Sequence, residues 1–340
     1  MEPPPAPGRP RRADLGRALA AGMLALACAC TTDPAPLGRP GPLPEGAFSL
    51  VVLPDTQNYP RDMAWLLDAQ IEWILARQAE QRIAMVLHVG DIVEANDEFE
   101  WFTAESILRK LDGRVPYALA VGNHDLGRGG SASDRSTRMV NHFSPARLVD
   151  DPSFGGAFEP DRLDNAYYLF SAGGADYLVV TLEFGPRDEA LAWASEVTAR
   201  HPDRKVIVLT HCYTYADGSR VGPGDDFHPR SYGMAEDRTN TVNDGDDIWR
   251  RYVRHHPNIV MVISGHITHG GAARQTAVGD HGNLVHEVLA NYQEYERGGG
   301  GWLRLVRIDP AAATITMWTM SPIADRLWDA PAHTFELPLP

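Results

Sequence analysis

Five short apolar runs in this chain each stop just before side chains that can bind a metal ion. The runs are residues 48–54, 83–89, 116–121, 205–210 and 258–263. Apolar runs of this length that are rich in β-branched residues and lack alternation are typical of strands buried on both faces of a sheet. Ligands of an open α/β sheet gather at the carboxyl ends of its strands. We therefore expect the residues that follow these runs to lie close together.

The residues that follow the runs offer only oxygen and nitrogen donors. In chain order they are Asp55 and Gln57, then Asp91, then Asn123 with His124 and Asp125, then His211, then His266. Carboxylate, amide and imidazole groups together suit a hard-to-borderline divalent cation. The pattern therefore predicts a divalent metal centre.

The order of these blocks resembles the calcineurin-like metallophosphoesterases. That family carries Asp-x-His, Gly-Asp, Gly-Asn-His-Asp/Glu, a lone His and Gly-His-x-His in this order. The present chain reads Asp55-Thr56-Gln57, Gly90-Asp91, Gly122-Asn123-His124-Asp125, His211 and Gly265-His266-Ile267-Thr268-His269. The resemblance covers roughly residues 48–325. It implies an α/β fold, a four-layer αββα sandwich of two mixed β-sheets flanked by helices, with the strands after Gly271 in the second sheet.

The resemblance also implies an activity and a role for each residue. The activity is hydrolysis of a small-molecule phosphate ester by a hydroxide that bridges two divalent ions, which could be Mn, Fe or Zn. Asp91 matches the carboxylate that bridges both ions. Asp55, Gln57 and provisionally His269 match the ligands of one ion, and Asn123, His211 and His266 those of the other. His124 matches a residue that contacts the phosphoryl group or protonates the leaving oxygen, and Asp125 would hold its tautomer.

Two departures from the family pattern fall on the same metal position. Gln57 stands where most members have His, and an amide oxygen is a weaker donor than imidazole. His269 comes three residues after His266, where the family has two. Side chains three apart in an extended segment do not share a face, so His269 reaches the metal only if the backbone turns. His281 and His286 are alternative ligands.

Two other functions remain open on these residues. One is a non-catalytic member that binds a phosphorylated or glycan ligand, which the two departures favour and the intact His124-Asp125 pair opposes. The other is an enzyme with a single tight metal. A tyrosinate-ligated iron is not expected, because Glu94 stands where the purple acid phosphatases, a related branch, carry Tyr.

Helical spacing of apolar residues predicts helices that alternate with the strands. Their expected ranges are 63–79 with Asp62 as N-cap, 97–111, 188–200 and 246–255. Further strands are expected at 283–293, 302–308 and 313–320. Two long segments rich in turn-forming residues, 125–165 and 213–245, follow ligand blocks, and we expect them to form the walls of a substrate cleft.

The N-terminus has the layout of an export signal. Four arginines precede the apolar stretch Ala18–Ala27, and Cys28 follows as in a bacterial lipobox. We therefore expect residues 1–30 to be a signal segment, 31–46 a Pro-rich linker and 47–335 the phosphoesterase domain. The protein would be periplasmic or on the outer surface, with a lipid anchor at Cys28 (Cys30 is an alternative). An ordinary signal peptidase site is the other interpretation.

The charge and the cysteine content exclude some binding partners and a disulfide within the domain. The formal charge is −14, and no block rich in Lys and Arg occurs outside the N-terminus, which argues against a nucleic-acid-binding patch. Cys212 is the one cysteine in the expected domain, so no disulfide can form within it. We expect Cys212 to be a buried apolar residue. The sequence does not indicate an oligomeric state.

Overall fold

The computed structural model describes residues 37–340. The predicted signal segment, the lipid-attachment cysteine and the first part of the linker lie outside these residues. Within residues 37–340, no helix has the length and apolar character needed to cross a lipid bilayer.

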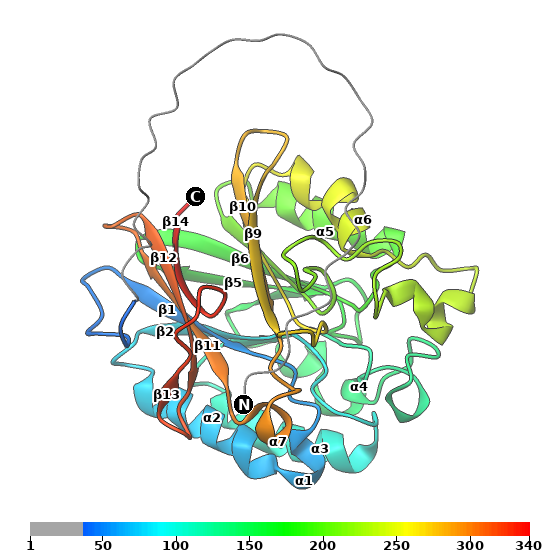
Figure 1. The fold of residues 1–340 in the computed structure, drawn as a ribbon. Coiled ribbons are helices and arrows are strands. Elements are labelled where there is room, and N and C mark those ends of the chain that lie inside the picture. The colour runs from blue at the N-terminus through cyan, green and yellow to red at the C-terminus, as the bar shows by residue number, and fades with distance from the viewer. Residues whose placement is uncertain (1–36) are drawn as a thin grey trace, which may run out of the picture.

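The first sheet is mixed and is built from both ends of the domain (Figure 1). Three parallel strands lie at one side of it, and their carboxyl ends point the same way. They are β1 (Phe48–Leu53), β2 (Ile83–His88) and β3 (Tyr117–Leu119). The antiparallel strands are β11 (Leu303–Asp309), β12 (Thr314–Ser321), β13 (Arg326–Leu327) and β14 (Thr334–Pro338).

The second sheet has the strand order β4-β5-β6-β7-β8-β10-β9 and is also mixed. Its four central strands β6, β7, β8 and β10 are parallel, and the strands at the two edges are antiparallel. The strands are β4 (Phe154–Ala157), β5 (Ala166–Ala172), β6 (Ala175–Leu182), β7 (Lys205–Thr210), β8 (Ile259–Ser264), β9 (Ala272–Val278) and β10 (Leu284–Ala290).

The expectation that all strands after Gly271 lie in the second sheet is wrong for the last four. Strands β9 and β10 lie there, but β11 pairs antiparallel with β1, with Phe48 opposite Ile308. Strand β12 then adds to β11. The C-terminal strands thus cover the edge of β1, which would otherwise present unpaired backbone groups.

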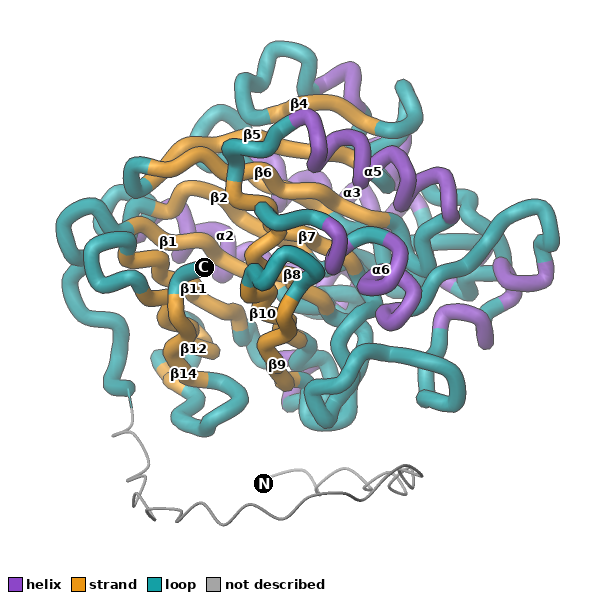
Figure 2. The backbone as a smooth tube through the Cα atoms, turned by 90° about the horizontal axis from the view of Figure 1, so that it is seen from above, coloured by secondary structure: helices purple, strands orange, loops and turns teal. Residues whose placement is uncertain are grey.

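Helices cover the outer faces of both sheets, so the molecule has four layers. In Figure 1 the helices α1 (Tyr59–Asp62), α2 (Ala64–Arg77) and α3 (Glu98–Leu108) lie below the strands, and α5 (Asp188–Arg200) and α6 (Gly245–Arg251) above them. Figure 2, seen from above, places α5 and α6 in front of the strands and α2 and α3 behind. This arrangement confirms the predicted αββα sandwich.

Alternation along the central strands explains the layers. In β6, Leu178, Val180 and Leu182 pack with α5 in one apolar cluster. Tyr177 and Val179 point the other way, into the larger cluster between the sheets. Because side chains alternate along a strand, one strand can serve both layers only if both of its sides are apolar. This is the reason for the unbroken apolar runs in the sequence.

The helix predictions hold with small shifts at the ends. The predicted 97–111 helix is α3 followed by the 3-10 turn Arg109–Leu111, and Asp97 caps α3 by accepting the Glu100 N–H at 2.9 Å. The predicted 246–255 helix is α6 followed by a 3-10 turn, Val253–His255, and Asp244 forms a capping box with Asp247. The prediction for Asp62 is wrong, because this residue ends α1, and α2 begins without a side-chain cap.

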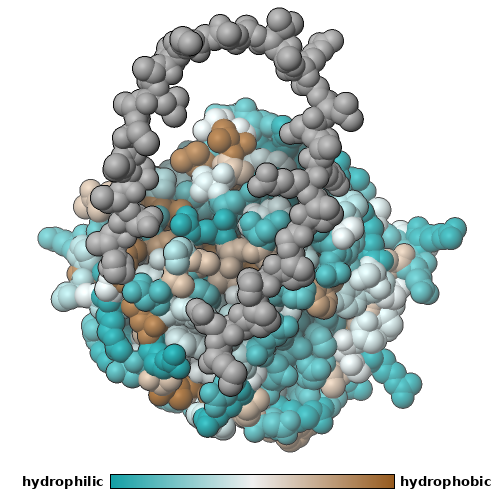
Figure 3. Space-filling view, viewed as in Figure 1, coloured by the Kyte–Doolittle hydropathy of each residue, from teal (hydrophilic) through white to brown (hydrophobic). Residues whose placement is uncertain are grey.

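The two long segments are ordered and contain short elements. They hold α4 (Met139–His142), strand β4 and several 3-10 turns. Helix α7 (Glu296–Gly299) follows β10. The face drawn in Figure 3 is mostly hydrophilic, with hydrophobic residues in separate patches.

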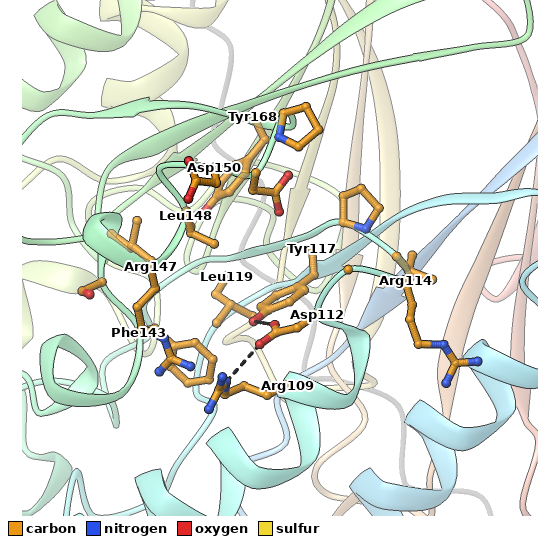
Figure 4. Close-up of a pocket in the computed structure, with 17 residues that line it drawn as sticks. Arg109, Asp112, Arg114, Tyr117, Leu119, Phe143, Arg147, Leu148, Asp150 and Tyr168 are labelled. Carbon is orange, nitrogen blue, oxygen red and sulfur yellow. Dashed lines mark hydrogen bonds and ion pairs between the residues drawn. The ribbon is translucent and has the colours of Figure 1, made fainter.

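A cavity of about 420 Å³ lies around β3 (Figure 4). In it Asp112 accepts hydrogen bonds from Arg109 and Tyr117. None of the predicted site residues lines this cavity. It is therefore a feature separate from the predicted metal centre.

Candidate metal centre

The predicted ligands come from both sheets and meet where the parallel strands end. Asp91 follows β2, His211 follows β7 and His266 follows β8. All three are buried, and each offers one ligand atom within 4.8 Å of the others. Burying three polar side chains at one point costs free energy unless they share a partner such as a cation. The pattern of strand ends in the sequence thus located a real convergence.

Glycines beside the acidic residues make this convergence sterically feasible. A Cβ at Gly122 would clash with Oδ1 of Asp91, and a Cβ at Gly265 would clash with Oδ1 of Asp55. Asp91 and His266 themselves have φ values of 49° and 70°. Non-glycine residues rarely adopt this left-handed region, and such strain concentrates at functional sites.

Asp91 is held as an ionised carboxylate. Its Oδ1 accepts the backbone N–H of His124 at 2.8 Å, and its Oδ2 lies 3.1 Å from Nε2 of His211. Burial alone would raise its pKa, but the His211 ring and the neighbouring histidines outweigh burial and hold the pKa at about 2. One oxygen is therefore fixed by the backbone while the other faces the cluster.

The tautomer of each clustered histidine is set by a backbone carbonyl. Nδ1 of His211 lies 2.8 Å from the Val89 oxygen, and Nε2 of His266 lies 2.7 Å from the Phe227 oxygen. A carbonyl can only accept, so these nitrogens carry the protons. With those nitrogens protonated, Nε2 of His211 and Nδ1 of His266 are the atoms that would face a bound cation, as in typical metal sites.

The electrostatics of the two rings differ. Burial lowers the pKa of His211, but the Asp91 and Asp55 carboxylates raise it to about 9. Burial and the nearby His211 lower the pKa of His266 to about 3. His211 thus balances the buried acids by holding a proton, which a bound cation would replace.

Asn123 contributes an oxygen to the same cluster. It is buried, and its Oδ1 lies 3.2 Å from Nε2 of His211. The nitrogen that His211 directs to a ligand is therefore beside the amide oxygen that the resemblance assigns to the same metal. The structure brings Asn123, His211 and His266 together as the sequence predicted.

Asp55 is hydrogen-bonded to His266 and has a second partner that the sequence did not reveal. It accepts the His266 N–H at 3.0 Å and the Asn291 side-chain N–H at 2.8 Å. Burial raises its pKa well above the ordinary range, and Asp91 adds to this. Asn291 directly follows β10, so it obeys the same strand-end rule. Extending the predicted strand to residue 293 concealed this signal.

The side-chain amide of Gln57 has one bonded end and one end without a partner among the described residues. Its Nε2 donates to Oε2 of Glu94 at 2.6 Å. Its Oε1 is buried and has no hydrogen-bond partner among residues 37–340. Buried acceptors without partners are rare in proteins, and a cation would satisfy this oxygen. The buried oxygen and nitrogen atoms of Asp91, His211 and His266 are the other candidate ligand atoms. With this unpartnered amide oxygen, the residues fit a divalent metal.

His124 occupies the open side of the site. Its side chain is 29% exposed, and its Nδ1 lies 2.9 Å from the backbone oxygen of Glu94. Burial lowers the pKa of His124, but Asp91 and Glu94 raise it, and the net shift is upward. Nδ1 donates to the carbonyl, so Nε2 is the atom left for a substrate.

The expectation that Asp125 holds the tautomer of His124 is wrong. Asp125 instead accepts backbone N–H groups of Ile92, Val93 and Gly122 at 2.9, 3.0 and 2.8 Å. Burial, with the nearby Asp91, raises its pKa to about 7. Asp125 therefore ties the loop after β2 to the loop after β3, and the Glu94 carbonyl fixes the imidazole.

His269 lies outside the three-residue cluster. Its Nε2 is 3.9 Å from Asp226, and its side chain is 34% exposed. Its ring is 5.4 Å from that of Phe227, whose carbonyl binds His266, so it lies at the rim. Its role as a ligand stays a prediction.

The two alternative histidines are engaged elsewhere. His281 is exposed, and its Nε2 bonds the His255 carbonyl. Both ring nitrogens of His286 have partners, Thr276 and the Pro338 carbonyl. Both ring nitrogens of His286 are therefore occupied, and His281 lies exposed between β9 and β10. Cys212 is buried and unpaired, and burial raises its pKa, as expected for an apolar role.

Comparisons with known proteins identify the family of this chain. A family model described as "Calcineurin-like phosphoesterase" matches residues 48–270. The uncharacterized protein YvnB of Bacillus subtilis is 32% identical over 283 residues, which are 81% of this chain and 20% of that protein. The chain thus spans about a fifth of the length of this relative.

Three solved structures matched in the comparison share little sequence with the chain. The purple acid phosphatase PPD1 from yellow lupin has a TM-score of 0.49 and 15% identity, covering 88% of this chain and 55% of that one. GAP50, the anchor in the inner membrane complex of Plasmodium, has a TM-score of 0.45 and 12% identity, covering 86% and 89%. A predicted phosphoesterase from Streptococcus pneumoniae has a TM-score of 0.32 and 9% identity, covering 86% and 98%.

Proposed function

This chain belongs to the calcineurin-like phosphoesterase family, and we propose that it hydrolyses a small-molecule phosphate ester with two divalent metal ions. The observation that carries the proposal is the meeting of three buried ligand atoms within 4.8 Å, from Asp91, His211 and His266. The unpartnered buried oxygen of Gln57 supports a second position beside them.

The residues divide into two ligand sets that share Asp91. One set is Asn123, His211 and His266, in which the His211 side chain contacts the other two. The other is Asp55 and Gln57, with His269 as the last candidate. Two divalent cations, when bound, would neutralise charge on the phosphoryl group and lower the pKa of the attacking water. We leave Mn, Fe and Zn as the candidate metals, since each accepts such ligands.

His124 is the residue that we propose for proton transfer. Because Nδ1 donates to the Glu94 carbonyl, Nε2 is the atom able to hold a proton toward the substrate. The net upward shift of its pKa favours the protonated ring, which is the form that a general acid requires. A proton on Nε2 would pass to the leaving oxygen as the phosphorus–oxygen bond breaks.

A metal count combined with an ester panel tests this proposal. The purified protein would be analysed for metals and assayed with a phosphomonoester and a phosphodiester of p-nitrophenol. We expect two metal ions per chain and hydrolysis that stops with a chelator and returns with Mn²⁺. Hydrolysis with one ion per chain would instead identify a single-metal enzyme. Metal binding without hydrolysis of any ester would identify a binding protein.

We also propose export and lipid attachment, which rest on the sequence of residues 1–30 alone. The basic residues, the apolar stretch and Cys28 support this location. Mass spectrometry of the N-terminal peptide after expression in a bacterial host would detect acylated Cys28. A mature chain that begins elsewhere, or that retains residues 1–27, would refute the anchor.

A further inference from the structure

Glu94 contacts one of the two departures from the family pattern, Gln57, and also contacts His124, and its side chain has no role assigned so far. Its carboxylate accepts the Gln57 side-chain N–H at 2.6 Å, and its backbone carbonyl accepts Nδ1 of His124 at 2.9 Å. The same carboxylate lies 3.5 Å from Nδ1 of His124. One residue thus contacts a proposed ligand and the proposed proton donor.

The contact with Gln57 decides which end of the amide faces the site. The two ends of an amide have nearly the same shape, but only the oxygen has a lone pair for a cation, and the nitrogen only donates. A carboxylate only accepts, so Glu94 can bind the nitrogen end and not the oxygen end. With Nε2 held by Glu94, Oε1 is left buried and without a hydrogen-bond partner among the described residues.

We propose that Glu94 is a positioning residue that holds the oxygen of Gln57 toward one metal. This inference rests on the proposed metal centre. A His at position 57 would present a nitrogen lone pair to the metal. It has no amide that a partner would have to orient. Glu94 therefore makes Gln57 usable where most family members have His.

The backbone of Glu94 is itself held in place by hydrogen bonds. Its carboxylate can therefore fix the orientation of the Gln57 amide. Oε2 of the fully buried Glu100 accepts the backbone N–H groups of Glu94 and Ala95 at 2.9 and 2.7 Å. Arg61 in α1 binds the other oxygen of Glu100 at 2.6 Å. The carbonyl of Glu94 packs so closely on Gly130 that a Cβ there would clash with it. The N-terminal end of α3 thus anchors the loop that carries Glu94.

A double-mutant cycle on Mn²⁺ binding tests the proposal without relying on turnover. The variants are Glu94→Ala, Glu94→Gln, Gln57→His and the Glu94→Ala/Gln57→His double variant, titrated with Mn²⁺ in chelator-buffered solution. Loss of an outer partner typically weakens metal affinity by about 10–100-fold. In Glu94→Ala we expect Mn²⁺ affinity to fall by this factor at the weaker of the two proposed metal positions. Glu94→Gln should stay within a few-fold of wild type, because its amide oxygen can still accept the Gln57 N–H.

The Gln57→His variants show whether Glu94 acts by orienting the Gln57 amide or by acting on the metal directly. There Glu94→Ala should change Mn²⁺ affinity by less than about threefold, because imidazole has no amide to orient. Glu98→Ala serves as the charge-matched control, since Glu98 is an exposed acid four residues along, and it should bind Mn²⁺ as wild type does. Thermal unfolding of each variant would confirm that it folds.

Three results would overturn the proposal. An equal loss from Glu94→Ala in both backgrounds would mean that Glu94 acts on the metal directly. A loss in Glu94→Gln as large as in Glu94→Ala would show that charge, not the hydrogen bond, matters. Unchanged Mn²⁺ affinity in Glu94→Ala would show that Gln57 needs no partner. Failure of the proposed function would look different: Mn²⁺ would bind as expected while no ester is hydrolysed.

Discussion

Asp91 is the single residue that both proposed ligand sets share. One of its oxygens is fixed by the His124 N–H, and the other faces His211. Replacing it with Asn keeps the shape but removes the charge that holds two cations together. We expect Asp91→Asn to lower kcat/KM by several orders of magnitude and to reduce bound metal, measured by ester hydrolysis and metal analysis. Asp226→Asn, an exposed acid at the rim, should retain both metals. Turnover near the wild-type rate in Asp91→Asn would refute the shared-ligand role.

His124 should separate catalysis from metal binding. Its ring bonds a backbone carbonyl and faces the open side, so it holds no cation in the proposed assignment. We expect His124→Ala to lose roughly 10²–10⁴-fold in kcat, the range typical of general acid–base groups. Metal content should stay at the wild-type level. If metal analysis showed a large loss, His124 would have to be reassigned as a ligand.

At the scale of elements, the turns after the strands are as important as the ligands. A methyl group at Gly122 would clash with Oδ1 of Asp91, although the backbone of Gly122 lies outside the left-handed region. Gly122→Ala should therefore displace the Asp91 carboxylate. We expect Mn²⁺ affinity to fall at least tenfold and stability to fall by about 1–3 kcal/mol, as for other overpacked sites.

A second glycine variant controls this measurement. Gly41→Ala, where the added carbon would meet nothing within 4 Å, should match wild type in both Mn²⁺ titration and thermal unfolding. Wild-type Mn²⁺ affinity in Gly122→Ala would mean that the loops after β2 and β3 can shift apart. In that case the close approach of Gly122 to Asp91 would not be required for the metal centre.

The elements that sequence analysis predicted well are those whose signals are local. Apolar runs gave β1, β2, β7 and β8 to within about a residue, because strands buried on both faces need apolar side chains throughout. The pairing of β11 with β1 was missed, since it joins residues some 250 positions apart and leaves no local pattern. Asn291 was missed because the predicted strand ran past it, whereas the contacts of Asp125 were missed because no local pattern marks them. They depend on how one loop lies against another.

At the scale of the whole molecule, the proposed metal centre lies at the junction of the two sheets. Asp55, Gln57, Asp91 and Asn123 follow strands of the first sheet, and His211 and His266 follow strands of the second. The first ligand set draws on both sheets and includes two imidazoles in contact. The second set relies on an amide oxygen and a partly exposed His269. The two positions should therefore differ in affinity.

Stepwise chelation measures this difference. We expect a chelator to remove one metal well before the other, and activity to be lost with the first one removed. Gln57→His should tighten the weaker position, because imidazole is a stronger donor than an amide oxygen. Simultaneous loss of both metals at equal chelator concentration would show that a further ligand completes the weaker position.

Because the ligands come from both sheets, metal binding should stabilise the fold as a whole. Without a cation, Asp55 and Asp91 remain buried near each other, which destabilises the folded chain, and His211 offsets only part of this. A cation that binds only the folded chain adds about 2.7 kcal/mol at a concentration of 100 Kd. For a chain of 340 residues, that corresponds to a rise in Tm of roughly 4 °C. Calorimetry of the chelated protein with and without Mn²⁺ measures the rise, and Asp91→Asn should show a much smaller one. If the wild-type Tm did not change at saturating Mn²⁺, the cation would bind the unfolded chain equally well, and the junction between the sheets would not be its site.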